Sequence, residues 1–358
     1  MNSKHKPVIL VINPGSTSTK VALFTGKEQT AIENIKHDDK ELVRFNSLWS
    51  QFDFRISAIE DFLEDYDIIN DSIDAVVGRG GILKPLKRGT YLVNDEMIRD
   101  ARAGVRGSHV SNLGCALADH IAKKFKCNAY TVDPVSVDEF EPVARFSGHP
   151  LIERRSLSHS LNLRAATFWA AEKLGIDAQK NNFIVAHLGS GISIAPIKNS
   201  RVIDVNDASS AGPFSPERTG ALPLLPLIDL CFSGKYSNSD IKEMVMSRGG
   251  LKAYLGTKDM QEIEKRIENN DENAKSVFIA MCYQIAKEIG AMATVLNGDV
   301  KAIVLTGGLA KSHMLITEVT GRIMFIAPVF VFPGELEMEA MAQGVLRVLT
   351  GKEELRNY

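Results

Sequence analysis

The sequence predicts an α/β protein made of two similar domains, because one pattern occurs twice. ILVINPGSTSTKVALF (residues 9–24) and FIVAHLGSGISIAPI (183–197) each contain an apolar strand, a polar residue, one spacer, Gly-Ser and a second apolar strand. A related stretch, AIVLTGGLA (302–310), runs from a strand through Gly-Gly into a helical pattern. Many α/β proteins end strands in glycine-rich turns, but two copies half a chain apart favour an internal duplication.

In the first half we predict four strands, over residues 8–13, 18–24, 74–78 and 128–132, the last ending at Asp133. Residues 109–126 are predicted to be a helix, with Ser108 as its N-cap. The apolar residues at helical spacing there are Val110, Leu113, Leu117 and Ile121.

The second half repeats this order, with predicted strands over residues 183–187, 192–197, 302–306 and 328–332. A long helix over 273–296 carries an apolar stripe typical of a core: Val277, Met281, Ile285, Ile289 and Met292. Residues 148–156 are expected to cross between the domains. The predicted domains are therefore 1–150, joined by a C-terminal helical segment over 335–358, and 151–334.

Composition limits the partners. The chain has 358 residues, is 44% hydrophobic and 24% charged, and carries a formal charge of -2, so no net field favours nucleic acid or an anionic membrane. Its four cysteines show no C-x-x-C spacing, which favours a reducing compartment. The apolar run before Asn13 is too short for a secretory signal, and no run approaches a membrane span of about 18 residues. We therefore predict a cytoplasmic protein.

The first glycine turn is not a nucleotide-binding P-loop. In G-x-x-x-x-G-K-[ST] counted from Gly15, the second glycine would stand at Lys20, and Val21 occupies the position after it. The residues that follow are β-branched and apolar, as in a strand. GSGISI (189–194) likewise lacks the third glycine of a dinucleotide-binding fingerprint, and it also opens a strand.

Two such domains, each presenting a hairpin turn toward an interdomain cleft, are the architecture of the ribonuclease H-like ATPases such as actin, hexokinase and the heat-shock chaperones. Five motifs make the resemblance specific: VINPGSTSTKVALF, VVGRGGILKPLKRGTYLVN, HLGSGISI, GPFSPERTGALP and LTGGLA. In this order they resemble the acetate kinase family, and GRGG and GPFSPER resemble its butyrate-type members. The resemblance implies reversible, direct in-line transfer of the ATP γ-phosphoryl group to butyrate or a branched short-chain acid.

This reaction needs cations and hydrogen-bond donors, since a carboxylate is already ionised and needs no general base. The resemblance implies that the catalytic residues are Arg79, His159, Arg218 and Asn13. The two glycines after Arg79 are expected to leave room for a ligand. The alternatives without a catalytic role are a surface arginine at 79, a loop ion pair between Arg218 and Glu217, and a structural histidine at 159. Ser158 stands where the family usually has an aromatic residue.

The resemblance also implies ATP or ADP with Mg²⁺. The expected contacts of the γ-phosphoryl group and the metal side are Asn13, Ser16, Ser18 and Lys20. The residues expected to contact the other phosphates and adenosine are His187, Gly189, Ser190, Gly191, Gly307, Gly308 and Asp259. The expected metal-side acids are Asp133 and Glu335, with Glu337 and Glu339 close enough in sequence to take the place of Glu335.

Other functions fit the same fold. An acetate or propionate kinase would share every motif, and an actin-like ATPase would share the hairpins but not the arginines and histidine. A sugar kinase needs a carboxylate base, for which Asp133 is a candidate. The expected partners are a short-chain carboxylate or acyl phosphate and ATP or ADP, and the family suggests a homo-oligomer, at least a dimer. The acid preferred among butyrate, isobutyrate, valerate and acetate stays open.

Overall fold

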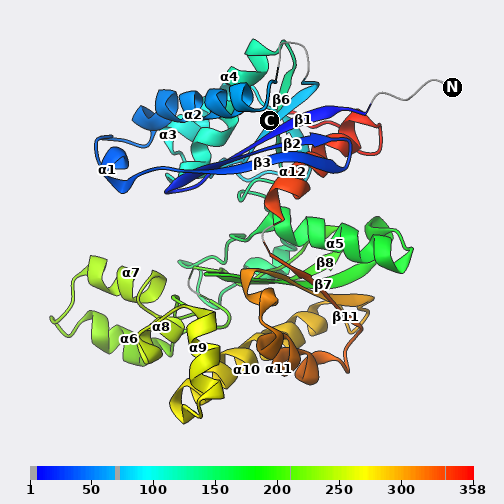
Figure 1. The fold of residues 1–358 in the computed structure, drawn as a ribbon. Coiled ribbons are helices and arrows are strands. Elements are labelled where there is room, and N and C mark those ends of the chain that lie inside the picture. Colours follow the sequence, from blue (N-terminus) through cyan, green and yellow to red (C-terminus); the bar gives the residue numbers. More distant parts are fainter. Residues whose placement is uncertain (1–5, 69–72, 210, 335) are drawn as a thin grey trace. The chain divides into compact units, whose positions relative to one another are not determined.

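The chain folds into two compact units. The structure, a computed structural model, describes residues 6–68, 73–209, 211–334 and 336–358. Unit 1 is Met1–Asp138 with Leu336–Tyr358, and unit 2 is Glu139–Glu335. In Figure 1 unit 1 carries the blue, cyan and red elements and unit 2 the green to orange ones. The predicted boundary at residue 150 thus falls inside unit 2.

Unit 1 is built on a mixed sheet of order β3-β2-β1-β4-β6-β5. Strand β1 pairs antiparallel with β2 and parallel with β4, and β4 pairs parallel with β6. The four predicted strands are confirmed, while β3 and β5 were not predicted. The bounds are β1 Val8–Pro14, β2 Ser18–Thr25, β3 Glu28–Lys36, β4 Ala75–Gly78, β5 Thr90–Leu92 and β6 Asn128–Val132.

Helices cover both faces of this sheet, as Figure 1 shows. Leu10 and Ile12 of β1 enter a core with residues of α2 and α4, and the alternate side chains of β1 face α12. The helices of unit 1 are α1 Asp39–Leu42, α2 Phe52–Asp65, α3 Asp95–Ala103, α4 Gly114–Lys124 and α12 Glu337–Leu349. A 3₁₀ turn, Trp49–Gln51, leads into α2.

The predicted start of the 109–126 helix is wrong. Val110–Leu113 is a 3₁₀ turn, α4 begins only at Gly114, and the capping side chain is His109, which accepts from the Ser111 amide. A β-carbon at Gly114 would lie 2.1 Å from the Arg79 carbonyl oxygen. The helix therefore begins where its backbone touches the end of β4, a contact that a sequence window does not reveal.

Unit 2 repeats the topology of unit 1. Its sheet has the order β11-β10-β7-β8-β9, with β7 antiparallel to β8 and parallel to β10, and β10 parallel to β11. These strands correspond in order and direction to β6-β4-β1-β2-β3, as the duplicated sequence pattern predicts. The predicted strands are confirmed as β7 Asn182–Leu188, β8 Ile192–Lys198, β10 Ala302–Gly307 and β11 Val329–Pro333, and β9 is Arg201–Val202.

Helix α5 (Ser160–Leu174) packs against one side-chain row of β7 and β8, and α10 (Glu272–Val295) packs against the other row. The predicted stripe of α10 lies in the core, although Val277 is only partly buried. The remaining helices are α6 Leu224–Cys231, α7 Asn238–Met246, α8 Gly250–Leu255, α9 Met260–Glu268 and α11 His313–Ile323. Short 3₁₀ turns lie at Pro142–Arg145, Ala178–Lys180 and Gly308–Lys311.

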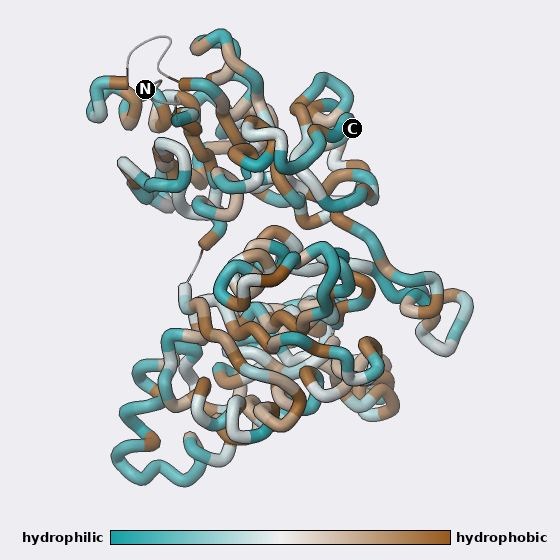
Figure 2. The backbone as a smooth tube through the Cα atoms, turned by 90° about the vertical axis from the view of Figure 1, so that its right-hand side faces the viewer, coloured by the Kyte–Doolittle hydropathy of each residue, from teal (hydrophilic) through white to brown (hydrophobic). Residues whose placement is uncertain are grey.

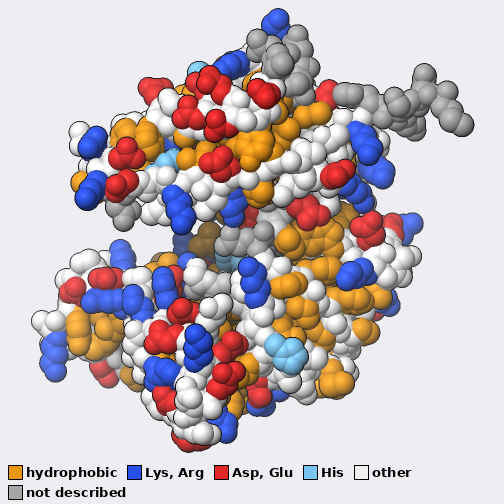
Figure 3. All heavy atoms as spheres, viewed as in Figure 1, with side chains coloured by type: hydrophobic (Ala, Val, Ile, Leu, Met, Phe, Trp, Pro, Cys, Tyr) orange, Lys and Arg blue, Asp and Glu red, His pale blue; other side chains and the backbone are white. Residues whose placement is uncertain are grey.

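The surface of each unit agrees with the composition. Figure 2 shows hydrophobic chain segments inside each unit and hydrophilic segments in its outer loops. Figure 3 shows basic and acidic side chains intermixed on the visible face, with no broad field of one sign. Within the described part of the chain, no helix has the length and apolar character needed to cross a membrane.

Candidate active site

Three predicted residues lie at one edge of the unit 1 sheet. Asn13 lies near the end of β1, Arg79 follows β4 and Asp133 follows β6. Because β1, β4 and β6 are parallel, their carboxyl ends share an edge, and this edge is where open α/β sheets bind ligands.

Glu337, the first residue of α12, joins two of these residues. Its Oε1 lies 2.8 Å from Arg79 Nη1, and its Oε2 accepts a hydrogen bond of 2.9 Å from Asn13 Nδ2. Arg79 is 8% exposed, so the alternative of a surface arginine is wrong. Glu335, the predicted acid, lies outside the described residues. Glu337 is therefore the acid that the structure brings to the strand edge.

The glycines after Arg79 make room for protein, contrary to the expectation that they make room for a ligand. A β-carbon at Gly80 would lie 2.4 Å from Pro134, and one at Gly81 would lie 2.3 Å from Asn112 Oδ1. Asn112 also accepts a hydrogen bond of 2.8 Å from the Ile82 amide. These glycines thus allow the loop that carries Arg79 to lie close to its neighbours.

His109 is a neighbour of Arg79 that the sequence analysis missed. Its Nδ1 lies 2.8 Å from Ser111 Oγ. Partial burial, and then the Arg79 cation, lower the pKa of His109. The ring is therefore neutral at neutral pH and can offer one N–H donor beside Arg79. No sequence signal distinguished it from the other histidines.

Asp133 has an unusual backbone. It is 2% exposed with φ of 39°, a conformation uncommon outside glycine. Its Oδ1 accepts a hydrogen bond of 2.7 Å from the Gly89 amide, and its own amide donates to the Gly89 carbonyl. Such strain is typical of functional positions. The Gly89 contact fixes the carboxylate at the strand edge.

The β1–β2 turn carries the polar residues predicted to contact the γ-phosphoryl group. Ser16 is exposed at its tip, and the Gly15 amide donates to the Ser18 carbonyl at 2.8 Å. Lys20 is paired with Asn13 in the sheet register, so the two side chains leave the same face. The structure thus brings Lys20 and Asn13 together on the face that α12 covers.

In unit 2 the two predicted histidines meet. The His159 and His187 rings stack with centroids 4.1 Å apart and 27° between their planes. His187 lies directly opposite Ser193 in the β7–β8 register, and Ser193 Oγ lies 3.0 Å from His159 Nδ1. Asn162 Nδ2 lies 3.4 Å from His187 Nδ1. Ser193 and Asn162, which the sequence analysis missed, therefore orient the two rings.

Arg218 lies in a loop held against the β7–β8 turn. Its Nη1 donates to the Ala208 carbonyl at 2.8 Å, and its buried Nε has no hydrogen-bond partner among the described residues. Burial lowers the pKa of Arg218. Glu217 pairs with Lys258 at 2.7 Å, so the predicted alternative of an Arg218–Glu217 loop bridge is wrong.

The glycines predicted to contact nucleotide differ in their surroundings. A β-carbon at Gly191 would lie 2.4 Å from Arg218 Nη1, and one at Gly307 would lie 2.4 Å from the Leu188 carbonyl oxygen. At Gly189 it would lie 3.3 Å from His187 Nε2, whereas at Gly308 it would meet nothing within 4 Å. Only Gly308 therefore borders open space, while the other three allow close packing.

The two remaining nucleotide-side residues have contacts within the protein. The Ser190 carbonyl accepts a short hydrogen bond from Ser215 Oγ. Asp259 is exposed and caps α9, where its Oδ1 accepts from the Gln261 amide at 2.9 Å. Capping accounts for an aspartate at this position without a ligand.

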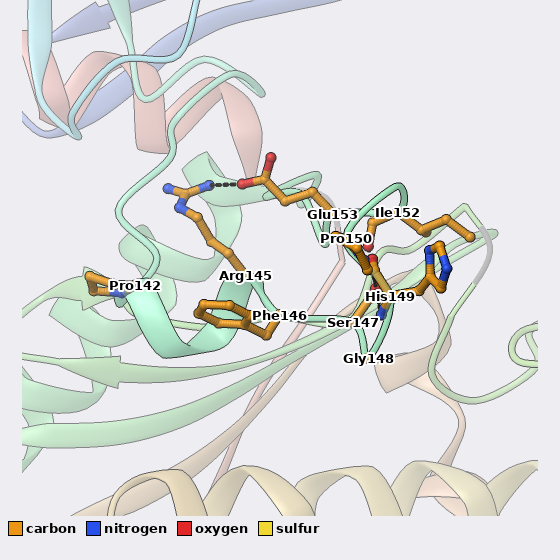
Figure 4. Close-up of a pocket in the computed structure, with 9 residues that line it drawn as sticks. All are labelled: Pro142, Arg145, Phe146, Ser147, Gly148, His149, Pro150, Ile152 and Glu153. Carbon is orange, nitrogen blue, oxygen red and sulfur yellow. Dashed lines mark hydrogen bonds and ion pairs between the residues drawn. The ribbon is translucent and has the colours of Figure 1, made fainter.

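Two cavities of unit 2 lie apart from these side chains. One, of about 730 Å³, is lined by residues of the 142–153 segment, which include Arg145, Phe146 and Ile152 (Figure 4). Arg145 and Glu153 approach to 3.9 Å at its rim. The other, of about 700 Å³, has Phe214 and Thr219 in its lining. None of the predicted site residues lines either cavity.

Oxygen donors that suit Mg²⁺ are present at the unit 1 strand edge. Among the described residues no cluster of three or more His, Cys, Asp and Glu side chains could hold a metal by itself. Magnesium bound with a nucleotide uses one or two carboxylates, phosphate oxygens and waters. The Glu337 carboxylate beside the Asn13 amide, together with Asp133 on the same edge, fits that requirement.

The chain is similar in sequence to a known protein family and to individual known proteins. A family model described as the Acetokinase family matches residues 154–327. The chain is 49% identical to "Probable butyrate kinase 2" of Caldanaerobacter subterraneus, over 98% of this chain and 99% of the relative. It is 46% identical to "Butyrate kinase 2" of Clostridium acetobutylicum with the same coverage.

Solved structures share the fold at lower identity. The chain is similar to the crystal structure of Porphyromonas gingivalis acetate kinase, with a TM-score of 0.79, 20% identity and coverage of 96% of this chain and 100% of that one. A propionate kinase from Francisella tularensis gives a TM-score of 0.75 at 17% identity, over 94% and 98% of the two chains. These matches confirm the predicted two-domain α/β fold.

Proposed function

The chain belongs to the acetokinase family, and from that premise we propose that it catalyses reversible phosphoryl transfer between ATP and a short-chain carboxylic acid. The proposed acceptor is butyrate or a branched acid of similar size, and the products are butanoyl phosphate and ADP. The observation that carries this proposal is the identity of 49% and 46%, over nearly the full length of both chains, to relatives named butyrate kinases.

The chemistry of the unit 1 residues supports the same reaction. A carboxylate oxygen of the acid attacks the γ-phosphorus, and the bond to the β-phosphate oxygen breaks with ADP as the leaving group. No proton has to be removed, so the site must supply positive charge and alignment. We assign the acid carboxylate to the Arg79 fork, which is held by Glu337, itself bonded to Asn13.

Unit 2 supplies the complementary groups in this proposal. The Arg218 guanidinium and the His159 ring would donate to the phosphoryl oxygens during transfer. Ser193 and the stacked His187 fix the orientation of the His159 ring, which reduces the reorganisation needed when charge develops. The glycines at 189, 191, 307 and 308 would lie along the nucleotide.

Magnesium fits this site as the ion that accompanies the nucleotide. Glu337, Asn13 and Asp133 would hold it, directly or through water, and it would neutralise charge on the phosphate oxygens. A reducing, cytoplasmic location, which the cysteine pattern favours, and a homo-oligomeric state, which the family resemblance suggests, belong to the proposal as well.

Two competing functions explain fewer of the observed site features. A sugar kinase needs a base for an un-ionised hydroxyl, and the Oδ1 of Asp133 already accepts from the Gly89 amide. An actin-like ATPase gives no reason for a buried Arg79 and a stacked pair of histidines. An acetate or propionate kinase differs from our proposal only in the size of the acid.

Hydroxamate trapping of the acyl phosphate tests the proposal. Purified protein is assayed with MgATP and a series of acetate, propionate, butyrate, isobutyrate and valerate. Each additional buried methylene contributes about 1 to 3 kcal/mol, or roughly 10- to 200-fold in kcat/KM, and a four-carbon acid has two more carbons than acetate, so its kcat/KM should be higher by roughly 10²-fold or more. A kcat/KM that is highest for acetate would contradict the butyrate assignment, and no turnover of any acid would contradict the acid-kinase assignment.

A further inference from the structure

A buried arginine lies beneath the β1–β2 turn. Arg55, in α2, is 0% exposed, and its guanidinium points at the turn from the face of the sheet opposite to α12. All five of its N–H groups find acceptors. The acceptors, with distances to the donor nitrogen, are Gly15 O at 2.9 Å, Ser18 O and Thr19 Oγ1 at 3.0 Å, and Gln51 Oε1 at 3.0 and 3.1 Å.

These acceptors are all neutral. No Asp or Glu among the described residues forms an ion pair with Arg55, and burial lowers its pKa to about 10, which leaves it charged at neutral pH. Buried cations are normally paired with an acid, because an unpaired one costs several kcal/mol of solvation. His37, whose ring contacts Thr19 Oγ1, has a pKa lowered by burial and then by the Arg55 cation, so its ring adds no second positive charge at neutral pH.

The guanidinium also determines which way the turn's peptide groups point. In a trans peptide the N–H points opposite to the preceding C=O. Since the Gly15 carbonyl accepts a hydrogen bond from Arg55 Nη2, the Ser16 N–H is directed away from the core, at the exposed tip of the turn. The bond to the Ser18 carbonyl anchors the other end of the turn. Arg55 thereby fixes both ends of the turn and leaves the polar groups of its tip for a ligand.

We propose that Arg55 is a positioning residue for the γ-phosphoryl group, holding the 15–18 turn in its anion-binding form and placing behind it a positive charge that no acid among the described residues pairs. This inference rests on the proposed function, because it takes the β1–β2 turn as the site of the γ-phosphate. It identifies a source of attraction for the dianionic γ-phosphoryl group in addition to Lys20 of β2. Arg55 itself touches no substrate.

The test compares affinities for MgATP and MgADP by titration calorimetry, without any acid. Arg55→Lys keeps the charge but offers only three donors from one atom, and Arg55→Met removes both the charge and the donors. We expect Arg55→Met to weaken ATP binding about tenfold more than ADP binding, since only ATP carries the γ-phosphate. Arg55→Lys should recover part of this difference. kcat for the acid-dependent reaction should fall by roughly 10²-fold in Arg55→Met, because the turn is no longer aligned.

Lys124→Met is the matched control. Lys124 lies on the neighbouring α4 and forms a surface ion pair with Glu60 of α2, so the variant removes one cation from the same unit without touching the turn. Its ATP and ADP affinities should both equal those of the unmodified protein. Circular dichroism and the melting temperature report whether each variant is folded. If Arg55→Met is not folded, Arg55→Lys alone is compared with the unmodified protein.

The outcomes separate the two proposals. If Arg55→Lys weakens ATP and ADP binding by the same factor, or leaves both unchanged while lowering only the melting temperature, Arg55 is merely structural and the inference is overturned. If the unmodified protein phosphorylates no carboxylic acid, the proposed function fails. The ATP to ADP affinity ratio still decides the role of Arg55 in that case, because the ratio does not depend on the acceptor.

Discussion

The two hairpin turns, one in each unit, begin with the same Gly-Ser pair and are held in different ways. In unit 1 residues 15–18 separate the last paired residues of β1 and β2, and in unit 2 residues 189–191 separate those of β7 and β8, so the unit 1 turn is one residue longer. A buried guanidinium bonds the carbonyls of the first turn, whereas the hydroxyl of Ser215 bonds a carbonyl of the second.

The side chains that lie beside the two turns also differ in their chemistry. Asn13, two residues before the first turn, meets the carboxylate of an Arg79–Glu337 ion pair. His187, at the equivalent position before the second turn, meets the His159 ring and lies opposite a serine. The two units thus share the backbone plan while the side chains differ: an ion pair lies beside the unit 1 turn, and two stacked rings and a hydroxyl lie beside the unit 2 turn. The following variants test this difference.

The largest effect is expected from His159→Ala. If the ring donates to the phosphoryl group only in the transition state, kcat should fall by about 10² to 10³ while KM for both substrates stays within roughly twofold. Steady-state kinetics and the melting temperature are measured together, with His149→Ala in the exposed 142–153 segment as the control. Full kcat per folded molecule with a lowered melting temperature would make His159 structural, and the catalytic role proposed for the stacked rings of unit 2 would lose its main support.

Gly191→Ala should have the next largest effect. The new β-carbon would lie 2.4 Å from Arg218 Nη1, so the guanidinium must move, and a misplacement of this size costs up to about 10²-fold in kcat/KM. The control is Gly321→Ala in α11, where a β-carbon meets nothing within 4 Å. That control should keep its activity and gain about 0.5 to 1 kcal/mol in free energy of unfolding. Unchanged activity in Gly191→Ala would show that the position of Arg218 does not depend on this glycine.

Glu337→Gln tests the charged organisation of unit 1. Glutamine keeps an acceptor for Asn13 but leaves the buried Arg79 without its anion. We expect kcat/KM for the acid to fall about tenfold, and the free energy of unfolding in urea to fall by about 1 to 3 kcal/mol. Glu339→Gln, which alters the next acid on α12 and its bond to Gln343, should change both quantities less. The reverse order would identify Glu339 as the functional acid.

Ser215→Ala should have the smallest effect of the four. It removes a neutral hydroxyl that donates to the Ser190 carbonyl and accepts from the Arg218 amide. A neutral hydrogen bond contributes about 0.5 to 1.5 kcal/mol, so KM for ATP should rise by roughly 2- to 10-fold. The initial rate is measured as a function of ATP concentration for Ser215→Ala and, in parallel, for Arg55→Met. A larger loss in Ser215→Ala than in Arg55→Met would contradict the view that charge matters most at the unit 1 turn.

Sequence patterns predicted the repeated part of this protein well. The apolar runs on both sides of a Gly-Ser pair along 9–24 and 183–197 identified both hairpins, because a strand buried on both faces is apolar along most of its length. The elements between the repeats were missed. Helix α2, which carries Arg55, and the short helices of the 222–256 region were not predicted from the sequence.

By itself, the sequence determined the duplicated α/β plan, the acetokinase resemblance, and the choice of Asn13, Arg79, His159, His187 and Arg218, since these lie in or beside local motifs. Only the tertiary structure decided which groups hold them. Glu337 meets Asn13 across 324 positions of the chain, and Ser193 meets His159 across 34. It also decided that the glycines at 80, 81 and 191 make room for protein atoms. The physical reason is that packing joins residues distant in sequence, and no local pattern of residues encodes the partner.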